Sequence, residues 1–136
     1  MSFTQTLIGM GAVGLVAQSL LSAVLPDPTG IFVHSLSYDN GMVTQDRTVV
    51  TSQPSFYAQW AVNVVDAETG QMVPECAGNG ATPYREGRKS LTFTLSDWTG
   101  NSNCTPDVLI DGRKYELQAV WSWGDKNVSA SQGFVK

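Results

Sequence analysis

The chain has 136 residues, a formal net charge of −4 and a sequence pI near 4.7. Nucleic-acid binding requires clustered Lys and Arg side chains that replace the counterions of phosphates, and the one dense basic run, residues 85–89, is interrupted by Glu86. The composition therefore argues against a nucleic-acid partner, and residues 31–136 are enough for one compact domain.

The first element is a hydrophobic segment, residues 7–25, that contains no charged side chain. At about 1.5 Å rise per residue, a helix of this length would just cross the ~30 Å hydrocarbon core of a bilayer. Residues 1–6 carry no Lys or Arg and the cleavage signal is poor, so the segment does not resemble a secretory leader and we expect it to stay attached. The sequence thus predicts a hydrophobic helix over residues 1–26, which spans a membrane or packs inside an assembly.

One side of this predicted helix carries small and polar residues, namely Gly11, Gly14, Gln18 and Ser22. Their spacing places them on a common helix face. Small residues let another backbone approach closely, and Gln18 can hydrogen-bond across helices where no water competes. We interpret this as a helix-packing face. The alternative is that these residues are merely tolerated in a membrane helix.

A spacer rich in Pro and Gly, residues 27–30, separates this helix from a predicted β-domain over residues 31–136. Residues 31–37 alternate as in a strand, and Asn40-Gly41 is a strong hairpin signal ahead of a returning strand over residues 42–51. The single histidine, His34, lies on the first of these strands. Because no nucleophile forms a recognisable triad with it, we expect His34 to be a structural or surface residue.

The pattern sharpens in the third strand, where Phe56, Ala58, Trp60, Val62 and Val64 share one face. We expect a short strand over residues 71–73 and a long loop from Cys76 to Lys89. A strand over residues 91–95 and a second long loop over residues 96–107 follow.

The C-terminal part contains the last strong alternation, in which Tyr115, Leu117, Ala119, Trp121 and Trp123 share a face. Residues 128–135 are predicted to form a terminal edge strand. Seven or eight strands without a helical pattern after residue 30 predict an antiparallel sandwich, so the fold class is mainly β with one N-terminal hydrophobic helix.

The two cysteines, Cys76 and Cys104, both lie in turn-rich sequence. Without a CxxC motif or a histidine partner they fit a disulfide better than a metal or redox site. Such a bond indicates an oxidising compartment and would stabilise the fold by roughly 3.6 kcal/mol. Two unpaired surface thiols remain the alternative.

The segment from Leu109 to Ala119, LIDGRKYELQA, resembles the corner of immunoglobulin-like and fibronectin type III sandwiches. In that family a leucine lies six residues before a tyrosine, and the tyrosine hydroxyl bonds back to the corner backbone. The resemblance gives this role to Tyr115 and the place of the buried core tryptophan to Trp60. Because Leu117 stands where antibody domains have their second cysteine, any disulfide here is a different bond. The resemblance specifies no function.

Catalytic and metal-binding motifs are absent from the sequence: it has no HExxH, phosphate-binding glycine loop or loop of alternating oxygen ligands. We therefore expect no catalytic residues, metal, cofactor or small-molecule substrate. Trp121 lies on an apolar face and is explained by packing. Trp98 lies in a predicted loop, where it either contacts a ligand or packs over the sheet or beside Cys104.

These observations predict a non-enzymatic structural protein, with membrane lipid or other subunits as partners and the β-domain on the extracytoplasmic or particle-exterior side. The layout resembles minor virion proteins of membrane-containing phages. One alternative is a pilus-like filament subunit with the helix in the filament core. Another is a surface module that binds carbohydrate or a receptor.

Overall fold

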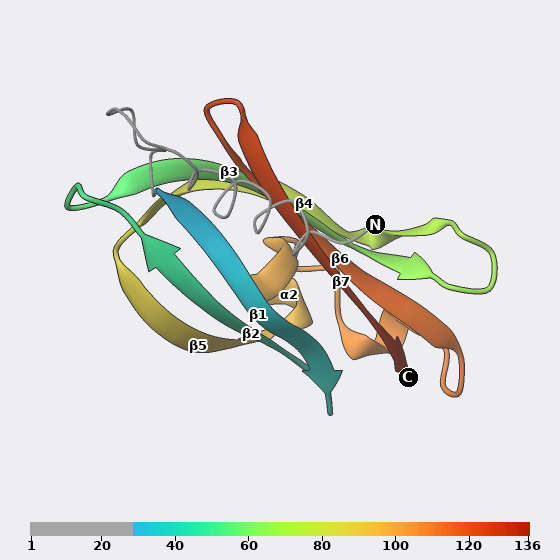
Figure 1. The fold of residues 1–136 in the computed structure, drawn as a ribbon. Coiled ribbons are helices and arrows are strands. Elements are labelled where there is room, and N and C mark those ends of the chain that lie inside the picture. The colour runs from blue at the N-terminus through green and yellow to red at the C-terminus, as the bar shows by residue number, and fades with distance from the viewer. Residues whose placement is uncertain (1–28) are drawn as a thin grey trace, which may run out of the picture.

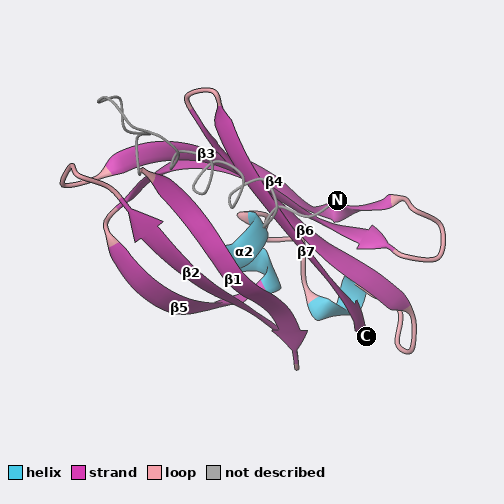
Figure 2. Cartoon of the chain, viewed as in Figure 1, coloured by secondary structure: helices cyan, strands magenta, loops and turns pink. Residues whose placement is uncertain are grey.

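The computed structural model describes residues 29–136, which form seven strands in two antiparallel sheets (Figures 1 and 2). The smaller sheet contains, in spatial order, β1 (Gly30–Asp39), β2 (Met42–Val50) and β5 (Gly87–Thr94). The larger sheet contains β4 (Met72–Tyr84), β3 (Phe56–Asp66), β6 (Lys114–Trp123) and β7 (Lys126–Val135). The mainly β, sandwich-like class is thus confirmed. The helix predicted over residues 1–26, with its packing face, lies outside the described residues.

The β1–β2 hairpin has the turn that its sequence predicts. Asn40 and Gly41 have φ angles of 52° and 83°, and Asp39 pairs with Met42 across them. Two successive left-handed residues match the right-handed twist of the strands that they join, and Asn-Gly is the pair that adopts them most readily.

The core lies between the two sheets, where alternate residues of each strand meet. Its largest fully buried aliphatic side chains are Ile31, Val43, Val64, Leu95, Leu117 and Val128. On one side of the molecule β1 packs against β7, and the rings of Tyr38 and Phe134 lie 4.2 Å apart. This contact closes the β1–β7 side of the sandwich.

Strand β4 corrects the prediction of a long loop from Cys76 to Lys89. Its glycines and prolines are typical of a loop, but it pairs with β3 continuously from Phe56↔Tyr84 to Asn63↔Ala77. An edge strand tolerates proline because half of its backbone groups face away from the ladder. Glycine at position 80 leaves room for the Trp60 ring, since an ideal Cβ there would lie 2.8 Å from Cζ2 of Trp60.

Two short helical segments correct the expectation of no helix after residue 30: α2 (Leu95–Thr99) and η1 (Pro106–Val108). Helix α2 begins where the Thr94 hydroxyl accepts a hydrogen bond from the Asp97 N–H at 3.1 Å. It ends at Gly100, which has a φ of 69°. A capping threonine and a left-handed glycine with only five residues between them permit a single helical turn. Within residues 29–136, no helix is long and apolar enough to cross a membrane.

Candidate functional site

The predicted disulfide between Cys76 and Cys104 is confirmed, with a Cα–Cα distance of 4.8 Å and both residues fully buried. It joins β4 to the segment that follows α2. The backbones are already close at this point, because an ideal Cβ on Gly78 would lie 1.5 Å from the carbonyl oxygen of Thr99. The disulfide therefore covalently fixes the region in which α2 packs on β4.

The other residues singled out by the sequence hold the sandwich together. The Tyr115 hydroxyl accepts a hydrogen bond from the Ile110 N–H at 2.8 Å, and this side chain is 3% exposed. Trp121 is also buried and donates its indole N–H to the Tyr84 hydroxyl at 3.1 Å. Trp60 is half-buried and donates to the Thr82 hydroxyl.

Trp98 belongs to α2 and is buried, with 4% of its surface exposed. Its indole N–H donates to the buried Oε1 atom of Gln45 at 2.8 Å. The ring thus belongs to the buried core, on the alternative that Trp98 packs over the sheet. Whether Trp98 also contacts a ligand stays a prediction.

A hollow of about 290 Å³ lies between the sheets on the side of β4 and β5, away from the β1–β7 contact. We call it the aromatic groove. Its walls are mainly apolar rings and chains, contributed by Trp60, Val62, Tyr84, Leu91, Phe93, Trp98 and Trp121. Four polar side chains complete the lining: Gln45, Arg47, Thr82 and Asp97.

Arg47 is the unusual residue of the aromatic groove. Its guanidinium carbon lies 5.0 Å from the centroid of the Tyr84 ring, and its Nε atom is buried without a hydrogen-bond partner. Burial lowers the pKa of Arg47 below its ordinary value and raises the pKa of Tyr84. Among residues 29–136 no carboxylate forms an ion pair with Arg47. Within the described residues, the direct partner of the Arg47 cation is therefore an aromatic ring and not a carboxylate.

Arg47, Gln45 and Tyr84 were not predicted from the sequence as site residues. A signal for the first two was present, because the alternation of β2 places Gln45 and Arg47 on the same inward face as Val43 and Val49. A charged residue on an otherwise apolar face is unusual and indicates a partner or a site. Tyr84 carried no comparable signal, since its surroundings were predicted to be a loop.

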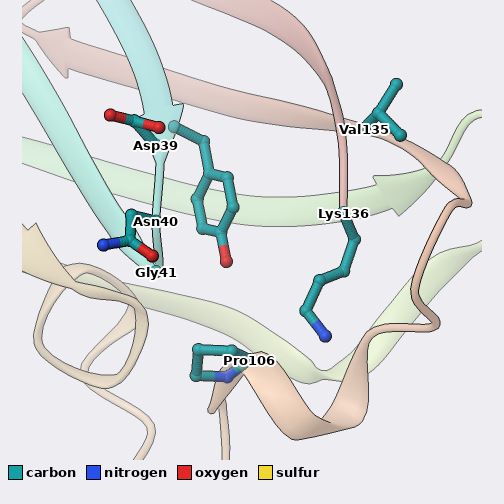
Figure 3. A pocket seen from close by; sticks show the side chains of 7 residues that line it. Asp39, Asn40, Gly41, Pro106, Val135 and Lys136 are labelled. Carbon is teal, nitrogen blue, oxygen red and sulfur yellow. The ribbon is translucent and has the colours of Figure 1, made fainter.

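A second, larger hollow of about 630 Å³ lies at the tip of the β1–β2 hairpin (Figure 3). Figure 3 shows Lys136 extending from the end of β7 toward Pro106. Its Nζ atom donates to the Asp111 carboxylate at 2.6 Å and to the Leu109 carbonyl oxygen at 3.2 Å. Hydrogen bonding raises the pKa of Lys136 and lowers that of Asp111. The cation of this hollow is therefore already neutralised within the protein.

The single histidine is exposed on β1, and its Nε2 atom forms a hydrogen bond of 2.7 Å with the Thr48 hydroxyl. In the part of the chain that the structure describes, no group of three His, Cys, Asp or Glu residues is arranged to hold a metal ion. Two further carboxylates are each paired with a single cation, Asp46 with Arg88 at 2.8 Å and Asp66 with Arg113 at 2.8 Å.

The described residues thus form a small β-domain of two antiparallel sheets with one internal disulfide. Comparison with protein-family models finds no match, and a search of curated proteins finds none either.

Proposed function

We propose that this protein is a non-enzymatic structural or assembly component, in which the hydrophobic segment holds the chain in nonaqueous surroundings and the β-domain is displayed from it. One observation carries the proposal: the uncharged residues 7–25 are followed almost at once by strand β1, which begins at Gly30. Burying a spanning helix gives effectively irreversible attachment. With so short a connection, the displayed domain stays close to whatever surface holds the segment.

The disulfide supports the placement of the domain. Disulfides form and persist in oxidising compartments, such as the periplasm, the cell exterior and the virion surface. We therefore place the β-domain on the extracytoplasmic or particle-exterior side, with lipid or other subunits around the hydrophobic segment. Minor virion proteins of membrane-containing phages have a similar layout, and we extend the proposal to that setting.

We also infer that the sandwich is of the immunoglobulin-like or fibronectin type III kind. The hydrogen bond from the Ile110 N–H to the Tyr115 hydroxyl supports this inference, because it is the bond of a tyrosine corner. The division of the strands into β1-β2-β5 and β4-β3-β6-β7 supports it as well.

Detergent phase partitioning of the full-length chain tests the anchor. We expect the wild-type protein in the detergent-rich phase and Val16→Arg shifted toward the aqueous phase, because an arginine at mid-segment costs about 2.5–3.5 kcal/mol on insertion scales. Thr92→Arg, on the exposed face of β5, is the matched control and should partition like the wild type. A wild-type chain that stays in the aqueous phase as a monomer would contradict the proposal.

A chain that stays in the aqueous phase as a large oligomer would instead favour the filament alternative. Analytical ultracentrifugation of the aqueous fraction distinguishes these outcomes. In a filament, the hydrophobic segments of neighbouring subunits cover one another, so Val16→Arg should then lower the sedimentation coefficient to that of a monomer.

A further inference from the structure

We propose that the aromatic groove is a binding site for a small organic monocarboxylate with a planar apolar body, and that the guanidinium of Arg47 binds its carboxylate. This site is independent of the attachment proposed for residues 7–25.

Arg47 carries a charge that no ion pair in residues 29–136 balances. A buried or half-buried cation is normally paired and hydrogen-bonded, because desolvation of an unpaired charge is costly. Arg47 instead has a buried Nε atom without an acceptor and no ion pair in residues 29–136. A carboxylate offers two acceptor oxygens in the geometry that a guanidinium prefers.

A second cation reinforces this preference for an anion. Strand register places Lys89 of β5 directly opposite Arg47 of β2, so both side chains leave the same face of the sheet. Lys89 is exposed and has no ion pair in the described part of the chain. Like charges directly opposite one another destabilise a sheet, and an anion bound between them removes that cost.

The size and lining of the groove define the rest of the ligand. A volume of about 290 Å³ is at the lower end of the range of small-molecule pockets, so it suits a single-ring compound better than a peptide or an oligosaccharide. Trp60, Phe93 and Leu91 provide half-buried apolar surface for a ring. Asp97 also lines the groove, and its negative charge disfavours a second carboxylate on the ligand.

The four tryptophans make the site directly observable. Trp60, Trp98 and Trp121 line the groove, whereas Trp123 does not and packs against Phe56, with ring centroids 6.0 Å apart. In ¹H–¹⁵N spectra of the full-length chain in nonionic detergent, we expect benzoate to shift the indole N–H signals of the first three residues. The signal of Trp123 is the internal control and should stay in place.

Two comparisons test the role of charge. Benzamide is the neutral analogue of benzoate. Its affinity should be lower by a factor of roughly ten or more, because it cannot form the charge-assisted pair. Arg47→Gln should weaken benzoate binding by a similar factor, and Lys89→Gln by a smaller one. Arg88→Gln is the matched control, since Arg88 pairs with Asp46 on the other face of the same sheet, and it should leave benzoate affinity unchanged.

The proposal is overturned if benzoate leaves all indole signals in place, or if benzamide produces the same shifts at the same concentration. Unchanged benzoate affinity in a folded Arg47→Gln variant also overturns it. If that variant does not fold, the wild-type comparison of benzoate with benzamide and the Lys89→Gln variant decide the question. Equal shifts at Trp123 and at the groove tryptophans would indicate unspecific binding and count against the site.

Discussion

Polar atoms at the tips of aromatic side chains connect distant parts of this chain. Each of three indole N–H groups has its own acceptor, in the pairs Trp60–Thr82, Trp98–Gln45 and Trp121–Tyr84. Buried polar groups need such partners, because an unpaired donor loses its bonds to water without replacement. A large ring with one anchored polar atom has a defined orientation, so these pairs contribute to a single arrangement of the core.

At this scale, Tyr115→Phe tests the corner hydrogen bond. The substitution removes the acceptor of the Ile110 N–H and should lower the free energy of unfolding by about 0.5–1.5 kcal/mol. Urea unfolding followed by fluorescence measures the change. Tyr57→Phe is the matched control, because Tyr57 is 70% exposed, and it should change stability by less than about 0.5 kcal/mol. Equal effects of the two substitutions would contradict the role of the corner.

Single elements of this fold depend on glycine where the backbones come closest. The inward face of β4 carries Gly78 beneath α2 and Gly80 beneath the Trp60 ring. Glycine is usually unfavourable within a strand because it contributes no side chain to packing and loses much entropy on folding. Here its missing Cβ is what allows the helical turn and an indole to lie against the strand.

Gly78→Ala should therefore be strongly destabilising. The new Cβ would overlap the Thr99 carbonyl oxygen, so α2 or β4 has to shift, at a cost of about 1–3 kcal/mol or more. Chemical denaturation of the variant measures the loss. Asn79→Ala, at the adjacent exposed position of the same strand, should remain within about 0.5 kcal/mol of wild type. If the Gly78→Ala protein were as stable as Asn79→Ala, the close approach of position 78 to the Thr99 carbonyl oxygen would not limit stability.

The same elements show what the sequence could predict and what it could not. Strands β3 and β6 were predictable because their alternating apolar residues coincide with their inward faces. Strand β4 was not predictable, since its inward positions include two glycines. The reason for glycine at these positions is close contact with α2 and with Trp60, and both are distant in sequence. Helix α2 is a single turn, too short for its periodicity to be recognised.

The candidate site was less predictable than the fold. The disulfide pairing followed from the two cysteines and their surroundings, and the structure confirms it. The aromatic groove combines residues from β2 to β6 and from α2, so its existence depends on how the two sheets pack. The inward positions of Gln45 and Arg47 were readable in advance, from the period of β2.

Considered as a whole, the molecule is a small domain in which one covalent bond crosses between distant segments. Small domains bury a smaller fraction of their surface than large ones, so their stability margin is narrow. Cys76 and Cys104 are separated by 28 positions and enclose the end of β4, all of β5 and helix α2. The bond therefore restricts the unfolded chain over much of its middle part.

The double variant Cys76→Ala/Cys104→Ala lacks the disulfide. Its free energy of unfolding should be lower by roughly 3–4 kcal/mol, because the unfolded chain without the bond has greater entropy. Urea unfolding at equilibrium measures this change. Addition of a reductant should lower the unfolding midpoint of the wild type and leave that of the double variant unchanged. A midpoint common to both proteins without reductant would mean that the bond contributes little.

The parallel placement of β1 and β7 has a mechanical consequence. Gly30 lies near Trp123 at one end of the sandwich, while Tyr38 and Phe134 meet at the other, so Gly30 and Lys136 are at opposite ends. A tensile force applied between them runs along the strands. Hydrogen bonds in antiparallel pairs are perpendicular to the strands, so this force loads many of them in shear at once. We therefore expect the domain to resist a pull between Gly30 and Lys136 better than the peeling of one edge strand, which breaks these bonds one after another.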